Sequence, residues 1–113
     1  MLTLPIKKQW FDMILNGTKT EEYREIKPFY TSRFKNIWGY PAYYHEQHSI
    51  ILRNGYSKNS EELLCNCSLA IRTGREEWGA IPNKKYYVLI LHEVFNLTEL
   101  KKLPNPKFVD IVK

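Results

Sequence analysis

Residues 17–24, with the sequence GTKTEEYR, contain charged side chains whose types and spacing could support binding chemistry. If the segment is a strand, Glu22 and Arg24 share one face, Lys19 lies on the other, and neither face is apolar. A carboxylate in that position can orient the guanidinium, and the pair suits a phosphate, a carboxylate or the polar edge of a base. We expect Lys19 to be an exposed ammonium at the mouth of a cleft, so that its removal weakens binding and spares folding.

Two other interpretations of this segment stay open from the pattern alone. Charged residues also fit an exposed edge strand, where they discourage aggregation. Alternatively, Lys19 and Glu22 are candidate catalytic residues, because a Lys–Glu pair supplies an acid and a base once burial tunes its pKa values. The sequence contains no recognisable Ser-His-Asp or Cys-His arrangement and no Gly-rich phosphate loop.

The order Gly17, Lys19, Glu22 and Arg24, directly after a short amphipathic segment, resembles the G-x-K-x-x-E-x-R signature of ASCH domains. These domains belong to the PUA-like superfamily of small β-barrels. Three further stretches resemble compact single-domain ASCH proteins, namely IKP at 26–28, NGYS at 54–57 and EWGA at 77–80. The resemblance covers roughly residues 2–95. It implies a bent barrel with a cleft lined by the motif, and a role in binding RNA or a nucleotide. We expect no cofactor.

Some relatives with this fold are enzymes, and one group removes an acyl group from modified cytidine. That group uses a Lys, a Thr three residues later and a distant Glu. Here Lys19 matches the Lys, but Glu22 stands at the Thr position and no distant Glu can be matched by motif. A small hydrolase acting on a modified nucleoside or RNA is therefore the first alternative to a binding domain. The second is a protein-interaction module, which an exposed apolar patch without a polar cleft would indicate.

Half of the sixteen aromatic residues lie between Tyr23 and Tyr44, interleaved with Arg24, Lys27 and two further cations. Aromatic rings stack on bases and cations follow phosphates, so the stretch suits a single strand. The same rings could instead pack a short helix onto the sheet. Outside this stretch, Trp78 lies in a glycine-flanked loop, where it either plugs the end of a barrel or flanks a cleft.

The ligand-binding residues expected from the motif, the turns and the resemblance are Lys19, Glu22, Arg24, Tyr56 and Trp78. No set of ligands for zinc is visible, and we predict no metal site. The cysteines, Cys65 and Cys67, are two apart and should be reduced thiols that point into the core from one strand.

The 113 residues, 43% of them hydrophobic, predict a single domain over residues 1–113. A net charge of +5 permits a nucleic-acid partner without requiring one. No apolar run is long enough to span a membrane and no signal-peptide pattern is present at the start, so we expect a cytoplasmic protein with no membrane partner.

Apolar spacing and turn signals predict a mostly β, α+β domain: a small bent sheet or β-barrel with two or three short helices. The resemblance to ASCH domains implies that this barrel is PUA-like. The expected strands are at 2–6, 19–26, 49–53, 63–71, 86–95 and 108–112. The expected helices are at 7–16, near 31–37 and after Asn96. The first helix should pack on the sheet through Trp10, Phe11, Ile14 and Leu15, and strand 86–95 should be central and buried on both faces.

Overall fold

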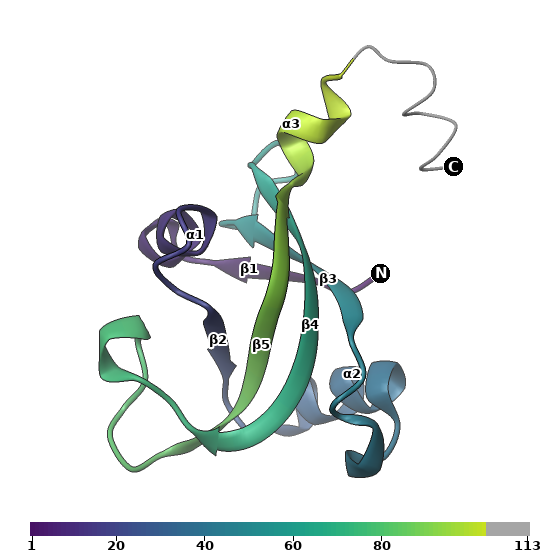
Figure 1. Ribbon diagram of the computed structural model, residues 1–113, viewed down its shortest axis with the longest axis vertical. Coiled ribbons are helices and arrows are strands. Elements are labelled where there is room, and N and C mark those ends of the chain that lie inside the picture. Colours follow the sequence, from purple (N-terminus) through teal and green to yellow (C-terminus); the bar gives the residue numbers. More distant parts are fainter. Residues whose placement is uncertain (104–113) are drawn as a thin grey trace.

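Five strands form one mixed sheet in the computed structural model, which describes residues 1–103 (Figure 1). The elements are β1 (Thr3–Ile6), α1 (Lys8–Leu15), β2 (Glu21–Arg24), α2 (Pro28–Trp38), η1 (Pro41–Tyr43), β3 (His48–Asn54), β4 (Glu62–Thr73), η2 (Glu76–Trp78), β5 (Lys85–Asn96) and α3 (Leu97–Lys101). The strand order is β1-β3-β4-β5-β2, with β1 parallel to β3 and the other pairs antiparallel. The predicted strand at 108–112 lies outside the described residues.

Strands β4 and β5 are the longest in the sheet and pair with each other as a hairpin, and both curve strongly (Figure 1). Alternation along β4 turns Leu63, Cys65 and Cys67 into the core, as the sequence pattern predicts. A shift of register between Asn66 and Cys67 interrupts the ladder, and such a bulge increases the local twist and bend. The predicted α+β fold is thus confirmed at the level of one curved sheet and three α-helices within residues 1–103.

Strand β5 is an interior strand of the sheet, as predicted, with β4 on one side and β2 on the other. Its first half is buried on both faces from Tyr86 to Leu89. Beyond Leu91 the strand emerges into solvent, and His92 and Glu93 are exposed. The prediction of a strand buried along its whole length is therefore correct only for the half that β2 and β4 both cover.

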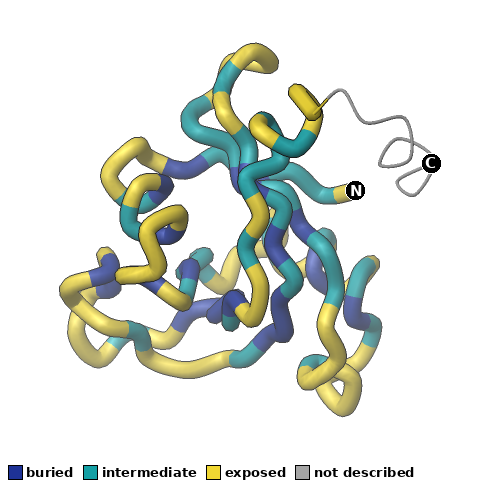
Figure 2. The backbone as a smooth tube through the Cα atoms, turned by 45° about the horizontal axis from the view of Figure 1, so that its top comes forward, coloured by how far each residue is buried: buried dark blue, intermediate teal, exposed yellow. Residues whose placement is uncertain are grey.

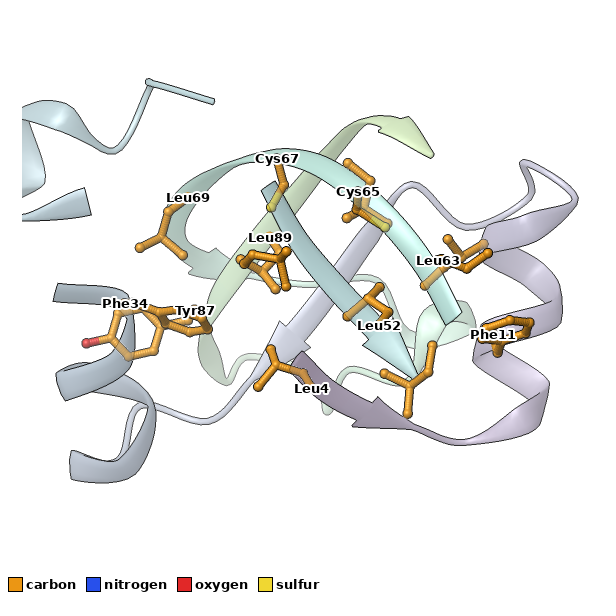
Figure 3. Close-up of a cluster of buried hydrophobic side chains, with 14 of the residues drawn as sticks. Leu4, Phe11, Phe34, Leu52, Leu63, Cys65, Cys67, Leu69, Tyr87 and Leu89 are labelled. Carbon is orange, nitrogen blue, oxygen red and sulfur yellow. The ribbon is translucent and has the colours of Figure 1, made fainter. Parts of the chain in front are cut away.

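Helix α1 packs across the sheet through one narrow stripe. Phe11 and Ile14 are buried, whereas Leu15, predicted to pack with them, keeps 44% of its surface exposed. Leu15 is the last residue of α1 and lies at the border of the stripe that Phe11 and Ile14 define. A central hydrophobic cluster joins this helix to α2 and to strands β1, β3, β4 and β5 (Figure 3). Buried residues gather along these elements, and the connecting loops are largely exposed (Figure 2).

Helix α2 is longer than the predicted segment 31–37, because Pro28 starts it at the first helical position, where proline is well tolerated. Its buried residues, Phe34 and Trp38, are fixed by aromatic contacts: the Phe34 ring meets the Tyr87 ring edge-on at 5.1 Å. The aromatic residues of this stretch therefore divide between core and surface. At the far end of the chain, Asn96 caps α3 by accepting a hydrogen bond from the Glu99 amide, as predicted.

Within residues 1–103, every helix is too short or too polar to cross a lipid bilayer.

The two buried thiols should make the protein less stable at alkaline pH. Cys65 and Cys67 are free and fully buried, and burial raises the pKa of each to about 12. In the unfolded chain the thiols ionise near their ordinary pKa of 9.0. Between these pH values the unfolded chain binds fewer protons, so the free energy of unfolding falls as the pH rises, by up to about 1.4 kcal/mol per pH unit per thiol.

Urea unfolding of the parent and of Cys67→Ala at a series of pH values from 8 upward checks this expectation. The alanine variant is destabilised by its cavity at every pH, but its loss of stability above pH 9 should be shallower than that of the parent. Parallel pH profiles for the two proteins would contradict the assignment of the slope to the buried thiol.

Candidate functional site

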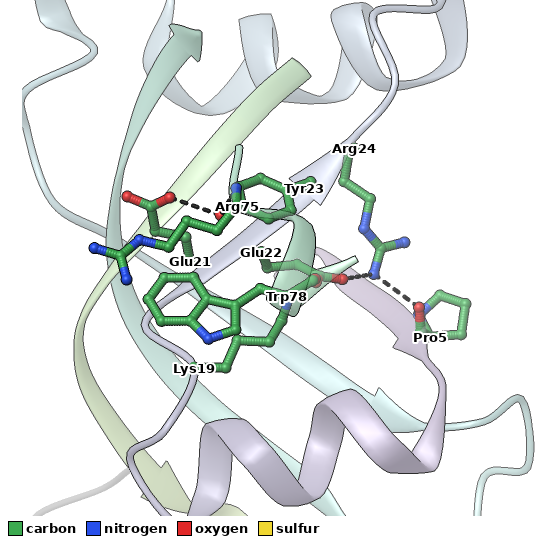
Figure 4. A network of polar contacts seen from close by, with 8 residues as sticks. All are labelled: Pro5, Lys19, Glu21, Glu22, Tyr23, Arg24, Arg75 and Trp78. Atoms are coloured by element: carbon green, nitrogen blue, oxygen red, sulfur yellow. Dashed lines mark hydrogen bonds and ion pairs between the residues drawn. The ribbon is translucent and has the colours of Figure 1, made fainter. Parts of the chain in front are cut away.

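Three charged side chains of the segment 17–24 form a buried network at the edge of the sheet (Figure 4). The Glu22 carboxylate pairs with both cations: its Oε1 lies 3.2 Å from Lys19 Nζ, and its Oε2 accepts from Arg24 Nη2 at 2.6 Å. The exposed fractions of the side chains are 1% for Lys19, 8% for Glu22 and 10% for Arg24. The alternative of a solvated edge strand is therefore wrong: β2 is an edge strand, but this part of its charge points inward.

Arg24 connects the two edge strands of the sheet. Besides Glu22, its guanidinium donates to the Pro5 carbonyl of β1 at 2.8 Å and to the Tyr30 hydroxyl of α2 at 3.3 Å. Burial by itself lowers the pKa of Arg24, but Glu22 and Tyr30 outweigh it and hold the pKa above its ordinary value. Its Nε is buried and has no hydrogen-bond partner in the described part of the chain. As predicted, Glu22 holds Arg24 in place.

Lys19 is not the exposed ammonium expected at the mouth of a cleft. Its Nζ donates to the Trp78 carbonyl at 2.7 Å and lies 4.9 Å from the ring centroids of both Trp10 and Tyr23. Strand β2 begins only at Glu21, so strict alternation does not reach back to Lys19, which turns inward and meets Glu22 three residues later. Burial lowers the pKa of Lys19, although Glu22 opposes that shift.

The loop that carries Trp78 is held against the sheet by side chains from several elements. Lys19 binds the Trp78 carbonyl, the Tyr23 hydroxyl accepts from the Arg75 amide at 3.0 Å, and the Tyr86 hydroxyl accepts from the Ile81 amide at 3.0 Å. The Tyr23 hydroxyl also donates to Glu21 at 2.8 Å (Figure 4). Residues of the motif segment and of β5 thus fix the position of a loop that lies far from the motif in the sequence.

Gly79 in this loop is expected to be intolerant of any side chain. Its φ is +102°, and a Cβ there would lie 2.9 Å from the Trp10 ring. Gly17 has a similar φ of +86°, but a Cβ there would meet nothing within 4 Å. Gly17→Ala should therefore cost only the left-handed strain of about 1–2 kcal/mol. Gly79→Ala should cost about 2–4 kcal/mol, because the clash with Trp10 is added to that strain.

Denaturant melts of the two glycine variants measure this difference. Equal destabilisation by Gly79→Ala and Gly17→Ala would contradict a tight contact between the loop and the Trp10 ring.

A cavity of about 680 Å³ opens beside the buried network. Four of the five predicted ligand-binding residues line it: Glu22, Arg24, Tyr56 and Trp78. The fifth, Lys19, does not line it but lies behind the lining, where it contacts Glu22 and the Trp78 carbonyl. The volume is within the range of small-molecule binding sites. Of the two candidate catalytic residues, Glu22 therefore contacts the cavity and Lys19 does not.

The remaining lining adds aromatic walls and basic residues beyond the five predicted site residues. The aromatic side chains are Trp10, Tyr23, Tyr30 and Tyr86, and the lysines are Lys7, Lys8, Lys27 and Lys84. Tyr23, Tyr30 and Lys27 belong to the aromatic-basic stretch, so the composition of that stretch is a sequence signal that could have identified them as lining residues. Nothing in the sequence points to Lys84, since only folding brings the β5 end of its loop to this edge of the sheet.

Cations outnumber acids along the cavity. Glu22 is already neutralised by its two partners, and the other lining carboxylate, Glu25, lies within ion-pair distance of Lys27 at 3.2 Å and of Lys84 at 3.6 Å. The lining side chains therefore carry a net positive charge, although Lys8 is also paired, with Asp12. Among residues 1–103 there is no group of three His, Cys, Asp or Glu side chains placed to hold a metal ion.

Trp78 and Tyr56 contribute differently to the cavity. Trp78 is only 9% exposed, and the Arg75 guanidinium lies 4.7 Å from the centroid of its ring. Tyr56, beside the turn after β3, is 88% exposed. Tyr56 therefore offers a free ring at the rim, whereas Trp78 offers only the part of its ring that forms the wall.

Comparisons of the chain with models of protein families, with curated proteins and with solved structures found no match.

Proposed function

We propose that the protein binds RNA or a nucleotide in the cavity at the β2 edge of the sheet, and that it is a PUA-like domain of the ASCH type. The observation that carries the proposal is the convergence of Glu22, Arg24, Tyr56 and Trp78 on one cavity. The first two come from β2, Tyr56 follows the β3 end, and Trp78 belongs to the loop after β4. A charged edge strand without a ligand site would not require these distant segments to meet.

The lining supports each part of such a ligand. Lysines at the rim match the charge of a phosphate, and aromatic walls match the faces of a base. The Glu22 carboxylate and the Arg24 guanidinium are 2.6 Å apart and both line the cavity, so an acceptor and a donor type lie side by side for the polar edge of a base. A polar floor beneath aromatic walls is typical of sites that recognise a flat, polar molecule.

The alternatives draw less support from the same geometry. A hydrolase that used Lys19 as its base would need the amine at the reacting atom, but Lys19 is 1% exposed and lies behind the lining. A protein-interaction module would present an apolar patch without a polar cleft, whereas this surface contains a cavity with a charged floor. The cavity favours a small or single-stranded ligand.

Calorimetric titration with a single-stranded RNA hexamer, the four ribonucleoside monophosphates and a duplex DNA tests the proposal. We expect binding to the RNA or to at least one nucleotide, weaker binding to the duplex because its bases stay stacked, and a loss of affinity with added salt. Absence of binding to all single-stranded probes and nucleotides would refute the proposal.

Two neighbouring lysines provide a matched control. Lys84 lines the cavity, and Lys85 is exposed outside the lining. Lys84→Gln should weaken binding several-fold, and Lys85→Gln, which removes the same charge one residue later, should change it little. Equal effects of the two substitutions would mean that net charge, and not the cavity, governs binding.

A further inference from the structure

The outer face of α2 carries a basic and aromatic surface that the core does not use. Residues 27–44 contain Lys27, Arg33 and Lys35 and no Asp or Glu. Phe29, in the first turn of the helix, keeps 53% of its surface exposed. Phe29 therefore presents an exposed ring beside the Arg33 guanidinium, and the neighbouring Lys27 pairs with Glu25 at 3.2 Å where the segment begins.

Phe29 is joined to the cavity by a continuous series of planar groups. The Arg24 guanidinium at the cavity floor donates to the hydroxyl of Tyr30, which lines the cavity. The Tyr30 ring meets the Phe29 ring edge-on, with centroids 5.0 Å apart. The Arg33 guanidinium lies 3.5 Å from the centroid of the Phe29 ring and donates to the Phe29 carbonyl at 3.0 Å. The series therefore runs from the buried network to the exposed face of α2.

We propose that Lys27, Phe29 and Arg33 form a second subsite, which binds the nucleotide adjacent to the one in the cavity. The inference rests on the proposed function and extends it from one nucleotide to a strand. The Phe29 ring and the Arg33 guanidinium both present flat faces on which a base can stack. Lys27 lines the cavity and has an exposed side chain, so it lies where the phosphate between the two nucleotides would pass.

The chemistry of the subsite favours a nucleic acid over an acidic peptide. A peptide carboxylate needs cations alone, whereas this surface combines cations with an exposed ring and a stacked guanidinium plane. Neither Phe29 nor the stacked face of Arg33 has a group that distinguishes one base from another. The subsite should therefore accept any base and contribute affinity more than sequence preference.

The test compares ligand lengths in the full chain by calorimetry. The probes are the four ribonucleoside monophosphates and the corresponding homopolymer RNA hexamers, each titrated into the parent and into Phe29→Ala. The parent should bind the hexamer of a preferred base more tightly than its monophosphate. Phe29→Ala should weaken hexamer binding by about 5- to 100-fold, the loss of one stacked base, and leave monophosphate binding within about twofold.

Two further variants control for folding and for charge. Arg33→Gln removes a cation and a plane from the subsite, and should weaken only the hexamer. Lys35→Gln removes a cation from the same helix at a position outside the planar series, and should leave both ligands nearly unaffected. If Phe29→Ala does not fold, as judged by its thermal melt, the comparison of Arg33→Gln with Lys35→Gln decides the question.

The outcomes separate this inference from the proposed function. If the parent binds neither monophosphates nor hexamers, both fail. If it binds a monophosphate as tightly as the hexamer, or if Phe29→Ala and Arg33→Gln weaken both ligands equally, the second subsite is wrong and the cavity site stands. A polyglutamate peptide could also displace the bound hexamer as effectively as a second RNA hexamer does. That result would overturn the subsite in favour of an acidic protein partner.

Discussion

Glu22→Gln is expected to lower the free energy of unfolding by about 3–5 kcal/mol, because it leaves two buried cations without their carboxylate. Lys19 is 1% exposed and Arg24 is 10% exposed, and Glu22 contacts both. Glutamine at this position does not expose either cation to water. Each cation therefore keeps the desolvation cost of its burial but loses the negative charge that offsets this cost. For a domain of this size the loss is a large part of the total stability.

The matched control is Glu25→Gln, the same chemical change three residues later. Glu25 also lies near two cations, Lys27 and Lys84, but its side chain is 46% exposed. Water replaces the lost partner there, and we expect stability close to that of the parent. Urea unfolding of both variants measures the difference. A Glu22→Gln variant as stable as Glu25→Gln would show that the two cations of the network do not need the Glu22 carboxylate to remain buried.

Lys19→Met is expected to destabilise the protein by about 2–3 kcal/mol, mainly because the Trp78 carbonyl loses the side-chain donor that satisfies it. The methionine keeps most of the apolar stem against Trp10 and Tyr23, so the packing loss is small. Glu22 keeps Arg24 as a partner, which is why this change should cost less than Glu22→Gln. The expectation reverses the one drawn from sequence, in which an exposed Lys19 has no role in folding.

Lys8→Met provides the comparison, because Lys8 is also paired, with Asp12 at 2.5 Å, but has an exposed side chain. Its replacement should leave the stability nearly unchanged, since water solvates both members of an exposed pair. Limited proteolysis adds a second readout: Lys19→Met should make the loop at 74–82 more susceptible to cleavage, and Lys8→Met should not. If the two variants melt alike and the loop stays protected in both, the contact from Lys19 to the loop does not hold it in place.

The local sequence pattern is enough to predict elements whose buried face follows from one periodicity, that of a strand or that of a helix. The alternation of Leu63, Cys65 and Cys67 identifies the core face of β4, and the spacing of Phe11 and Ile14 identifies the face of α1. The pattern of polar residues also identifies Glu22 and Arg24 as a pair, which the ion pair between them confirms. In each case the residues concerned lie close in the sequence and within one element.

The parts that the sequence pattern misses depend on where an element begins or on contacts between distant segments. Strict alternation places Lys19 on the wrong face, because β2 begins only two residues later and a turn does not continue the alternation of a strand. Lys84 lines the cavity only because β5 pairs with β2. The burial of Lys19 beneath Trp78 likewise needs the loop after β4, and no local rule relates positions 19 and 78.

The distribution of the three tryptophans gives the protein an intrinsic optical probe of its cavity. Trp10 and Trp78 both line it, while Trp38, the last residue of α2, is buried outside the lining and donates from its indole nitrogen to the Glu46 carbonyl. A ligand that enters the cavity changes the surroundings of two indoles and leaves the third as a constant background. In Trp38→Phe, all tryptophan emission would come from the cavity walls, so that occupancy could be followed on the unlabelled protein.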